Sequence, residues 1–125
     1  DEELYRRIAS LADRSEIDSF AAELIDRFGP LPEDVENLLA TVAIKQLCRT
    51  AGIGSLEAGP KGALVGFHNN HFAHPEKLAI FLTSQVGDVK LRPDHKLVYR
   101  RGWDDLNARM TGVHHLVESL AKLVA

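Results

Sequence analysis

The chain has 125 residues, of which 45% are hydrophobic and 26% charged, with a formal net charge of −3 at pH 7 and one cysteine, Cys48. This composition is ordinary for a globular protein, and the length fits a single domain, residues 1–125, with one continuous core. No stretch approaches the roughly 18 to 20 consecutive apolar residues of a membrane span, and a lone cysteine cannot form an internal disulfide, so we expect a cytoplasmic protein without membrane contact.

Acidic residues are concentrated near the start of the chain. Residues 1–39 carry 11 acidic and 4 basic side chains, whereas residues 40–125 carry 7 and 11. The sequence opens on Asp1, inside a charged, helix-like run, and not on an initiator methionine. We therefore expect a piece of a longer polypeptide, with any acidic partner surface in its first third.

Three helices are predicted in the N-terminal part. Residues 2–13 and residues 15–28 both carry apolar side chains at helical spacing. Ser15, with Asp18 three residues later, is expected to cap the second helix. A third helix is expected over residues 33–51, with an apolar surface broad enough for the central helix of the fold.

A rigid corner is predicted between the second and third helices. Gly29 suits the residue just past a helix end, and Pro30 cannot continue a helix. Pro32, followed by two acidic residues, has the composition of a new helix start. Because these residues have few backbone options, we expect the two helices to leave the corner at a defined angle.

The second helix has two distinct predicted faces. One is an apolar stripe made of Ile17, Phe20, Leu24 and Phe28. The opposite, outward row consists of Glu16, Ser19, Glu23 and Asp26, with Arg27 on its border. Carboxylates on a rigid helix can receive arginine side chains from a partner with geometric specificity, while the alternative is an ordinary solvated helix face.

After Gly52 the pattern changes to short strands. The turn at residues 59–62 predicts one hairpin, the turn at residues 93–95 predicts another, and a helix beginning at Pro75 separates them. A final helix is expected over residues 104–123. The predicted fold class is α+β: three N-terminal helices, two short β-hairpins separated by a helix, and a C-terminal helix, with a small, mostly antiparallel sheet packed on the helices. The strand order is not determined by the sequence.

No catalytic, cofactor-binding or metal-binding residues are predicted, because phosphate-binding loops and serine nucleophile motifs are missing from the sequence. His68, His71 and His74 are spaced so that three imidazoles can ligate zinc and leave a position for water, but the asparagines and the proline around them favour a polar loop. This domain is therefore not expected to be an enzyme. A zinc enzyme remains the alternative for the histidines.

The second hairpin is basic and provides an alternative function. Its bases, with Tyr99 interleaved, are Lys90, Arg92, Lys96, Arg100 and Arg101. Such a hairpin can follow a phosphate backbone, which would make this a small nucleic-acid-contacting module. Strand alternation, however, is expected to divide these bases between two faces, and exposed charge on an edge strand also protects against aggregation.

Several longer stretches, in order, resemble the C-terminal domain of the bacterial transcription-repair coupling factor (Mfd). They are "LYRRIA" (4–9), "ELIDRFGPLPEDVENLL" (23–39), "AGIGSLEAGPKGALVGF" (51–67), "KLRPDHKLVYR" (90–100) and the closing helix. The likeness spans nearly the whole chain. Its most specific part is "ELIDRFGPLP", and residues 68–89 match more loosely.

The resemblance implies a regulatory role. Proteins of that family are ATP-driven DNA translocases that displace stalled RNA polymerase and recruit the repair protein UvrA in the bacterial cytoplasm. The motor, with its ATP and Mg²⁺, and the sites for RNA polymerase and double-stranded DNA lie in other domains, so no cofactor is expected here. The C-terminal domain packs against the N-terminal UvrB-like module of the same protein, covers the surface for which UvrA competes, and represses the motor.

The resemblance also assigns residues to this contact. Glu23, Asp26 and Arg27 match the positions of the family's interdomain contact, where the two acids meet arginines of the UvrB-like module. Glu16 and Ser19 are expected at the periphery of the same interface.

Overall fold

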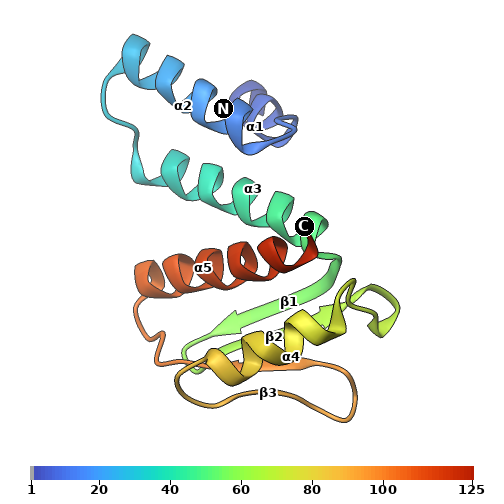
Figure 1. Cartoon of the computed structure of the whole chain (residues 1–125). Helices are drawn as coiled ribbons and strands as arrows, with labels where there is room; N and C mark the ends of the chain where they lie inside the picture. Colours follow the sequence, from blue (N-terminus) through green and yellow to red (C-terminus); the bar gives the residue numbers. More distant parts are fainter. Residues whose placement is uncertain (1) are drawn as a thin grey trace. The chain divides into compact units, whose positions relative to one another are not determined.

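The computed structural model describes residues 2–125 and shows the predicted α+β fold (Figure 1). The chain divides into two compact units, unit 1 up to Gln46 and unit 2 from Leu47 onward. That residues 1–125 form one domain stays a prediction. Within residues 2–125, no helix combines the length and the hydropathy needed to cross a bilayer.

Unit 1 consists of helices. They are α1 (Glu2–Ala9), α2 (Arg14–Phe28) and all but the end of α3 (Glu33–Ala51). The predicted ends of α2 and α3 agree with the structure, but α1 stops four residues before its predicted end. The Ser10 hydroxyl donates a hydrogen bond to the Arg7 carbonyl oxygen at 2.8 Å, and the chain then turns into α2.

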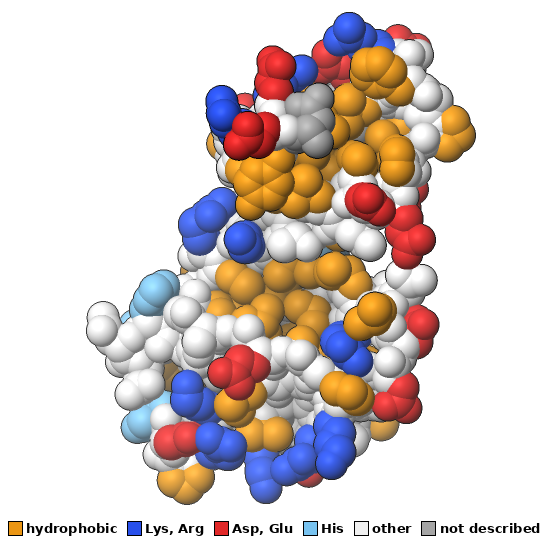
Figure 2. All heavy atoms as spheres, turned by 180° about the vertical axis from the view of Figure 1, so that it is seen from behind, with side chains coloured by type: hydrophobic (Ala, Val, Ile, Leu, Met, Phe, Trp, Pro, Cys, Tyr) orange, Lys and Arg blue, Asp and Glu red, His pale blue; other side chains and the backbone are white. Residues whose placement is uncertain are grey.

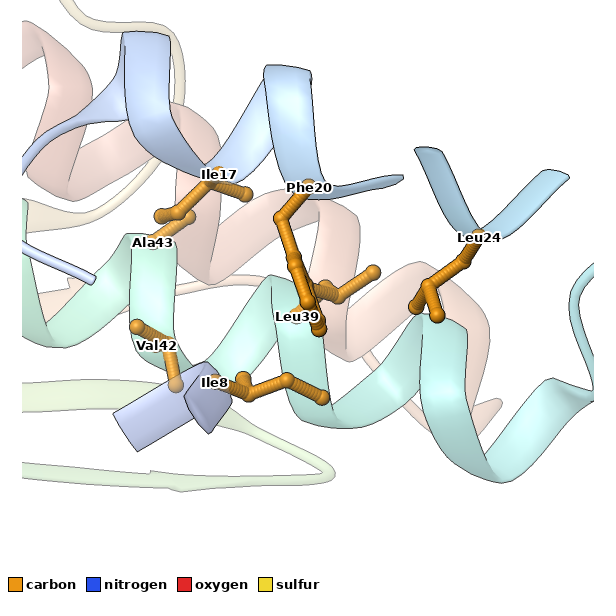
Figure 3. Close-up of a cluster of buried hydrophobic side chains, with 7 residues drawn as sticks. All are labelled: Ile8, Ile17, Phe20, Leu24, Leu39, Val42 and Ala43. Carbon is orange, nitrogen blue, oxygen red and sulfur yellow. The ribbon is translucent and has the colours of Figure 1, made fainter. Parts of the chain in front are cut away.

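The core of unit 1 is one cluster of apolar side chains, shown in Figure 3. The stripe of α2 supplies three members and α3 supplies three, and the full set is Ile8, Ile17, Phe20, Leu24, Leu39, Val42 and Ala43. Burying an aliphatic or phenyl side chain of this size contributes about 1.5–3 kcal/mol. The packing therefore turns the opposite face of α2 outward.

The N-cap of α2 is Asp13, so the prediction of Ser15 was wrong. The Asp13 carboxylate accepts a hydrogen bond from the Glu16 N–H at 2.9 Å, and the Glu16 carboxylate accepts one from the Ala12 N–H. Asp13 and Glu16 thus form a reciprocal capping arrangement. Asp18, three residues after Ser15, has a shorter side chain than Glu16 and pairs with Arg14.

Phe28 does not belong to the buried stripe, contrary to the prediction. Its side chain is 74% exposed, although its helical position is on the same side as Leu24. Phe28 is the last residue of α2, and Gly29 follows with a φ of +84°. At this end of the helix the ring borders an unfilled groove and is not enclosed by the core.

Unit 2 contains a four-stranded antiparallel sheet in the order β1-β2-β4-β3. The strands and helices of this unit are β1 (Ile53–Gly59), β2 (Gly62–Phe67), α4 (Pro75–Ser84), β3 (Val89–Leu91), β4 (Leu97–Arg100) and α5 (Leu106–Val124). A short 3-10 helix, His68–Asn70, follows β2. Both predicted hairpins and both predicted helices are confirmed.

One face of the sheet is buried. Val65 and Leu97 are fully buried, and Tyr99 is nearly so. The Tyr99 ring lies 5.9 Å from the Trp103 ring, which in turn packs against α5 at Gly112. Figure 1 shows α4 in front of the sheet, and α4 contacts α5, so both helices lie on this side. Leu106, the first residue of α5, is 72% exposed.

The turn between β3 and β4 is closed by an ion pair. The Arg92 guanidinium donates hydrogen bonds to both carboxylate oxygens of Asp94, at 3.1 and 2.5 Å. The Asp94 carboxylate also accepts a hydrogen bond from the Lys96 N–H at 3.2 Å. The hydrogen bond from Arg92, followed by those of the backbone and nearby charges, lowers the pKa of Asp94 to about 2.

We expect the Asp94 carboxyl to titrate with a midpoint near 2 in an NMR titration. Because the pKa falls on folding, the stabilisation is present above the ordinary value of 3.8 and is lost as the pH drops through about 2. Arg92→Gln should raise the midpoint toward the ordinary value, while Lys122→Gln, on a distant helix, should leave it in place. An ordinary midpoint in the unaltered chain would show that the pair does not form in solution.

Replacing Asp13 by alanine should lower the free energy of unfolding by about 0.5–2 kcal/mol, because the first turn of α2 loses its cap. The matched control is Asp18→Ala, which removes only an exposed (i, i+4) ion pair worth about 0.3–0.5 kcal/mol. Chemical denaturation of both variants measures the difference. Equal losses would contradict the role of Asp13 as the cap.

Candidate interaction site on helix α2

The predicted interface residues lie on the exposed side of α2. Glu23, Asp26 and Arg27 occupy its last two turns, while Glu16 and Ser19 lie nearer its start. All five are exposed. The prediction that this face points away from the core is confirmed.

Glu23 is held between two arginines. Its carboxylate lies 3.7 Å from an Arg7 nitrogen and 3.6 Å from an Arg27 nitrogen. Arg7 belongs to α1, and its guanidinium carbon stands 4.6 Å from the centroid of the Phe20 ring. This cation–π contact with a buried ring places Arg7 beside Glu23.

Arg7 was missing from the predicted site. In the sequence it appears as one of two adjacent arginines in the first helix, sixteen residues before Glu23. Only the packing of α1 against α2 brings the two side chains together. Periodicity within α2 carries no information about this contact.

Asp26 differs from Glu23 because it has no partner. Within residues 2–125, no hydrogen bond or ion pair engages its exposed carboxylate. Asp26 is thus the acid of the site that is available to a cation from outside. Glu16 is less available, because its carboxylate already accepts a hydrogen bond from the Ala12 N–H.

An apolar groove adjoins these charges. It has a volume of about 490 Å³ and lies among α1, the end of α2 and the corner that leads to α3. Its lining includes Leu4, Glu23, Arg27, Phe28, Leu31 and Val35. Ile25, one turn before Phe28, is 49% exposed. The site therefore combines fixed charges with exposed apolar surface, as protein interfaces do.

The histidines do not form a cluster. Within residues 2–125, no group of three or more His, Cys, Asp or Glu side chains is arranged to hold a metal ion. The Nδ1 atom of His74 lies 3.6 Å from the Glu76 carboxylate at the start of α4. Cys48 is half-buried in α3, and burial raises the pKa of its thiol. Neither feature gives a reactive centre.

The bases of the second hairpin do not all lie on one face of the sheet. Strand alternation and register place Lys90, Lys96 and Arg100 on one face of the sheet. Arg101 lies elsewhere, with its guanidinium carbon 3.9 Å from the centroid of the Tyr99 ring. Three of the five bases thus share one face, and Arg101 lies apart from them.

Comparison with known proteins decides the family. The model of the TRCF domain matches residues 2–78, more than half of the chain. The chain belongs to the TRCF domain family. The transcription-repair-coupling factor of Rickettsia conorii is 40% identical over 83% of this chain, and that of Escherichia coli is 29% identical over 93%.

The TRCF relatives are much longer than this chain. The matched regions cover 9% of the Rickettsia conorii protein and 10% of the Escherichia coli protein. A solved structure described as the C-terminal domain of transcription-repair coupling factor superposes with a TM-score of 0.77 over 97% of this chain and 78% of that one, at 20% identity. That likeness establishes the fold and agrees with the resemblance seen in the sequence.

Phe28→Ala should change the free energy of unfolding by no more than about 0.5 kcal/mol, because its ring lies mostly in solvent. Phe20→Ala is the matched control, since Phe20 is 5% exposed and its loss should cost about 3–5 kcal/mol. Chemical denaturation compares the two variants. A loss at Phe28 as large as that at Phe20 would mean that the ring is enclosed.

Proposed function

We propose that this TRCF domain is an autoinhibitory interaction module of a transcription-repair coupling factor. In this proposal the parent protein is an ATP-dependent DNA translocase that displaces stalled RNA polymerase and recruits UvrA. The domain docks through α2 on the N-terminal UvrB-like module of the same protein. Docking masks the surface that UvrA uses and represses the motor.

One observation supports the proposal most directly. Asp26, which has no partner within residues 2–125, lies next to Glu23, which is positioned between Arg7 and Arg27. Glu23 is already oriented by Arg7 and Arg27, so little side-chain entropy is lost when a partner arginine approaches it. Asp26 offers a second carboxylate three residues along the helix, without an internal ion pair to break. A guanidinium that meets both acids gains charge-assisted hydrogen bonds.

Arg27 is expected to favour one orientation of the docked partner. Its guanidinium carbon lies 5.5 Å from the centroid of the exposed Phe28 ring, at the border between the charges and the groove. An acidic or apolar residue of the partner can meet this border, while a basic one is repelled. The mixed charge of the site therefore favours one docking orientation.

A contact of this kind is weak enough to be reversible, and we call the docked arrangement of α2 on the UvrB-like module the latch. Exposed ion pairs contribute about 0–1 kcal/mol each, so the charges must act together with apolar contacts at Phe28 and the groove. A total of about 3–5 kcal/mol within one polypeptide keeps the docked state dominant, yet a stronger partner can displace it. Glu16 and Ser19 lie at the periphery of this interface.

The rest of the proposed function concerns other parts of the parent protein. ATP and Mg²⁺ serve the motor, and other domains bind RNA polymerase and the double-stranded DNA on which the motor acts. This domain itself has no enzymatic activity and needs no cofactor. The protein acts in the bacterial cytoplasm.

Charge reversal of both acids, Glu23→Lys with Asp26→Lys, should release the latch in the full-length parent protein. Loss of about 3 kcal/mol from the docked state raises the undocked fraction roughly a hundredfold. We expect tighter UvrA binding in calorimetric titrations and faster ATP turnover. The isolated domain should keep its circular dichroism spectrum, because both side chains are exposed.

The matched control is Asp18→Lys with Glu36→Lys, which changes the net charge equally at exposed positions of unit 1 outside the site. This variant should bind UvrA like the unaltered protein. Unchanged UvrA affinity in a folded Glu23→Lys, Asp26→Lys protein would contradict the proposal. Direct titration of this domain with the UvrB-like module provides an independent measurement.

A further inference from the structure

Among the described residues of unit 2, the two long helices α4 and α5 leave one face of the sheet uncovered. Opposite the buried side of Val65 and Leu97, alternation places Ser55, Leu64, Gly66 and Val98 on the second face. Both α4 and α5 lie on the buried side. The second face, here called the open face, has neither of these helices on it, although Val98 is only 8% exposed and Gly66 is buried.

Basic side chains outnumber acidic ones on and around the open face. The bases are Lys61, Lys90, Arg92, Lys96 and Arg100, and the acids are Glu57, Asp88 and Asp94. Figure 2 views the molecule from the side turned away from α4 and shows Lys and Arg side chains gathered along the lower edge of unit 2. A shallow hollow of about 500 Å³, lined by Glu57, Lys61, Arg92, Val98 and Arg100, lies in the same region.

The arginines and lysines differ in their partners. Arg92 and Arg100 are paired with Asp94 and Asp88, at 2.5 and 2.7 Å. The ammonium groups of Lys61, Lys90 and Lys96 make no ion pair with any residue in the range 2–125, although the charge of Lys96 contributes to the low pKa of Asp94. The uncompensated charge of the open face thus resides on lysines.

Lys96 lies flat across the sheet. Its ammonium nitrogen is 3.2 Å from the place where a side chain at Gly66 would begin, and the Ser55 hydroxyl is 2.6 Å from the same place. Gly66 is buried, and these two side chains occupy the space that a side chain at this position would fill. By register Lys90 is the diagonal neighbour of Lys96 on the adjacent strand, where the Cα atoms of such a pair are about 7–8 Å apart.

We propose that the open face binds the phosphate backbone of double-stranded DNA. A DNA strand carries one negative charge per about 3.4 Å of helix axis, so a surface with several uncompensated cations can contact successive phosphates. Lysines are point charges that suit sequence-independent phosphate contacts. The two neighbouring arginines are already paired with carboxylates of this chain. The choice of DNA over RNA rests on the proposed function of the parent protein.

The open face favours a duplex over a single strand. Single-stranded nucleic acids are bound by stacking of bases on aromatic side chains. In the described sheet, Phe67 and Tyr99 alternate onto the buried side, and the open face carries no aromatic ring. The contact is therefore a weak backbone contact without sequence preference.

The test is fluorescence anisotropy of a labelled duplex with the 125-residue chain, over a range of salt concentrations. Each neutralised phosphate adds about −0.9 to the slope of log affinity against log salt, so three lysines predict a slope near −3. The variant with Lys61→Gln, Lys90→Gln and Lys96→Gln should lose most of this slope and at least tenfold in affinity at low salt. The matched control, Lys45→Gln with Lys77→Gln and Lys122→Gln, removes the same charge outside the open face and should bind like the unaltered chain.

Three results would overturn the proposal. The first is no binding of the duplex at low salt, and the second is equal binding by the open-face variant and the control. The third is competition by polyglutamate as strong as that by DNA, because such competition would assign the open face to an acidic protein. Tighter binding of a single strand or of an RNA duplex would show that double-stranded DNA is not the preferred ligand of the open face. None of these results bears on Glu23 and Asp26, so the proposed latch is tested separately.

Discussion

The packing of one apolar stripe determines the rest of unit 1. Ile17, Phe20 and Leu24 of α2 meet side chains of α1 and α3, and this contact fixes the rotation of α2 about its axis. The acidic row faces outward because the stripe faces inward. The buried Phe20 ring also positions Arg7, so the same packing that stabilises the helices sets the geometry of the charges above them.

The order of helices and hairpins followed from periodicity and from turn residues. At the first turn of the sheet, Gly62 has a φ of +125°, and a side chain there would begin 2.0 Å from the Tyr99 carbonyl oxygen, so glycine is required. The strand order could not be predicted, because a hairpin can add either of its strands to an existing sheet. Tertiary packing places β4, and not β3, next to β2.

The candidate site was predicted only in part, for a related reason. A helical projection of α2 correctly placed Glu23 and Asp26 outward, since it needs only the helix period. The projection also placed Phe28 in the core, because it assumes that the neighbouring helices extend as far as the last turn. The contact of Arg7 with Glu23 and the groove form where segments distant in the sequence pack together. The periodicity of a single helix cannot predict such contacts.

Bracing of Glu23 by a residue from another helix has a mechanical consequence. Helix α1 is eight residues long, and one fully buried side chain, Ile8, anchors it to the core. Tension that peels α1 away would withdraw the Arg7 cation and leave Glu23 with Arg27 alone. The local charge around Glu23 on α2 therefore depends on α1 remaining packed against the core. A force that pulls on the N-terminal end of unit 1 would change that charge.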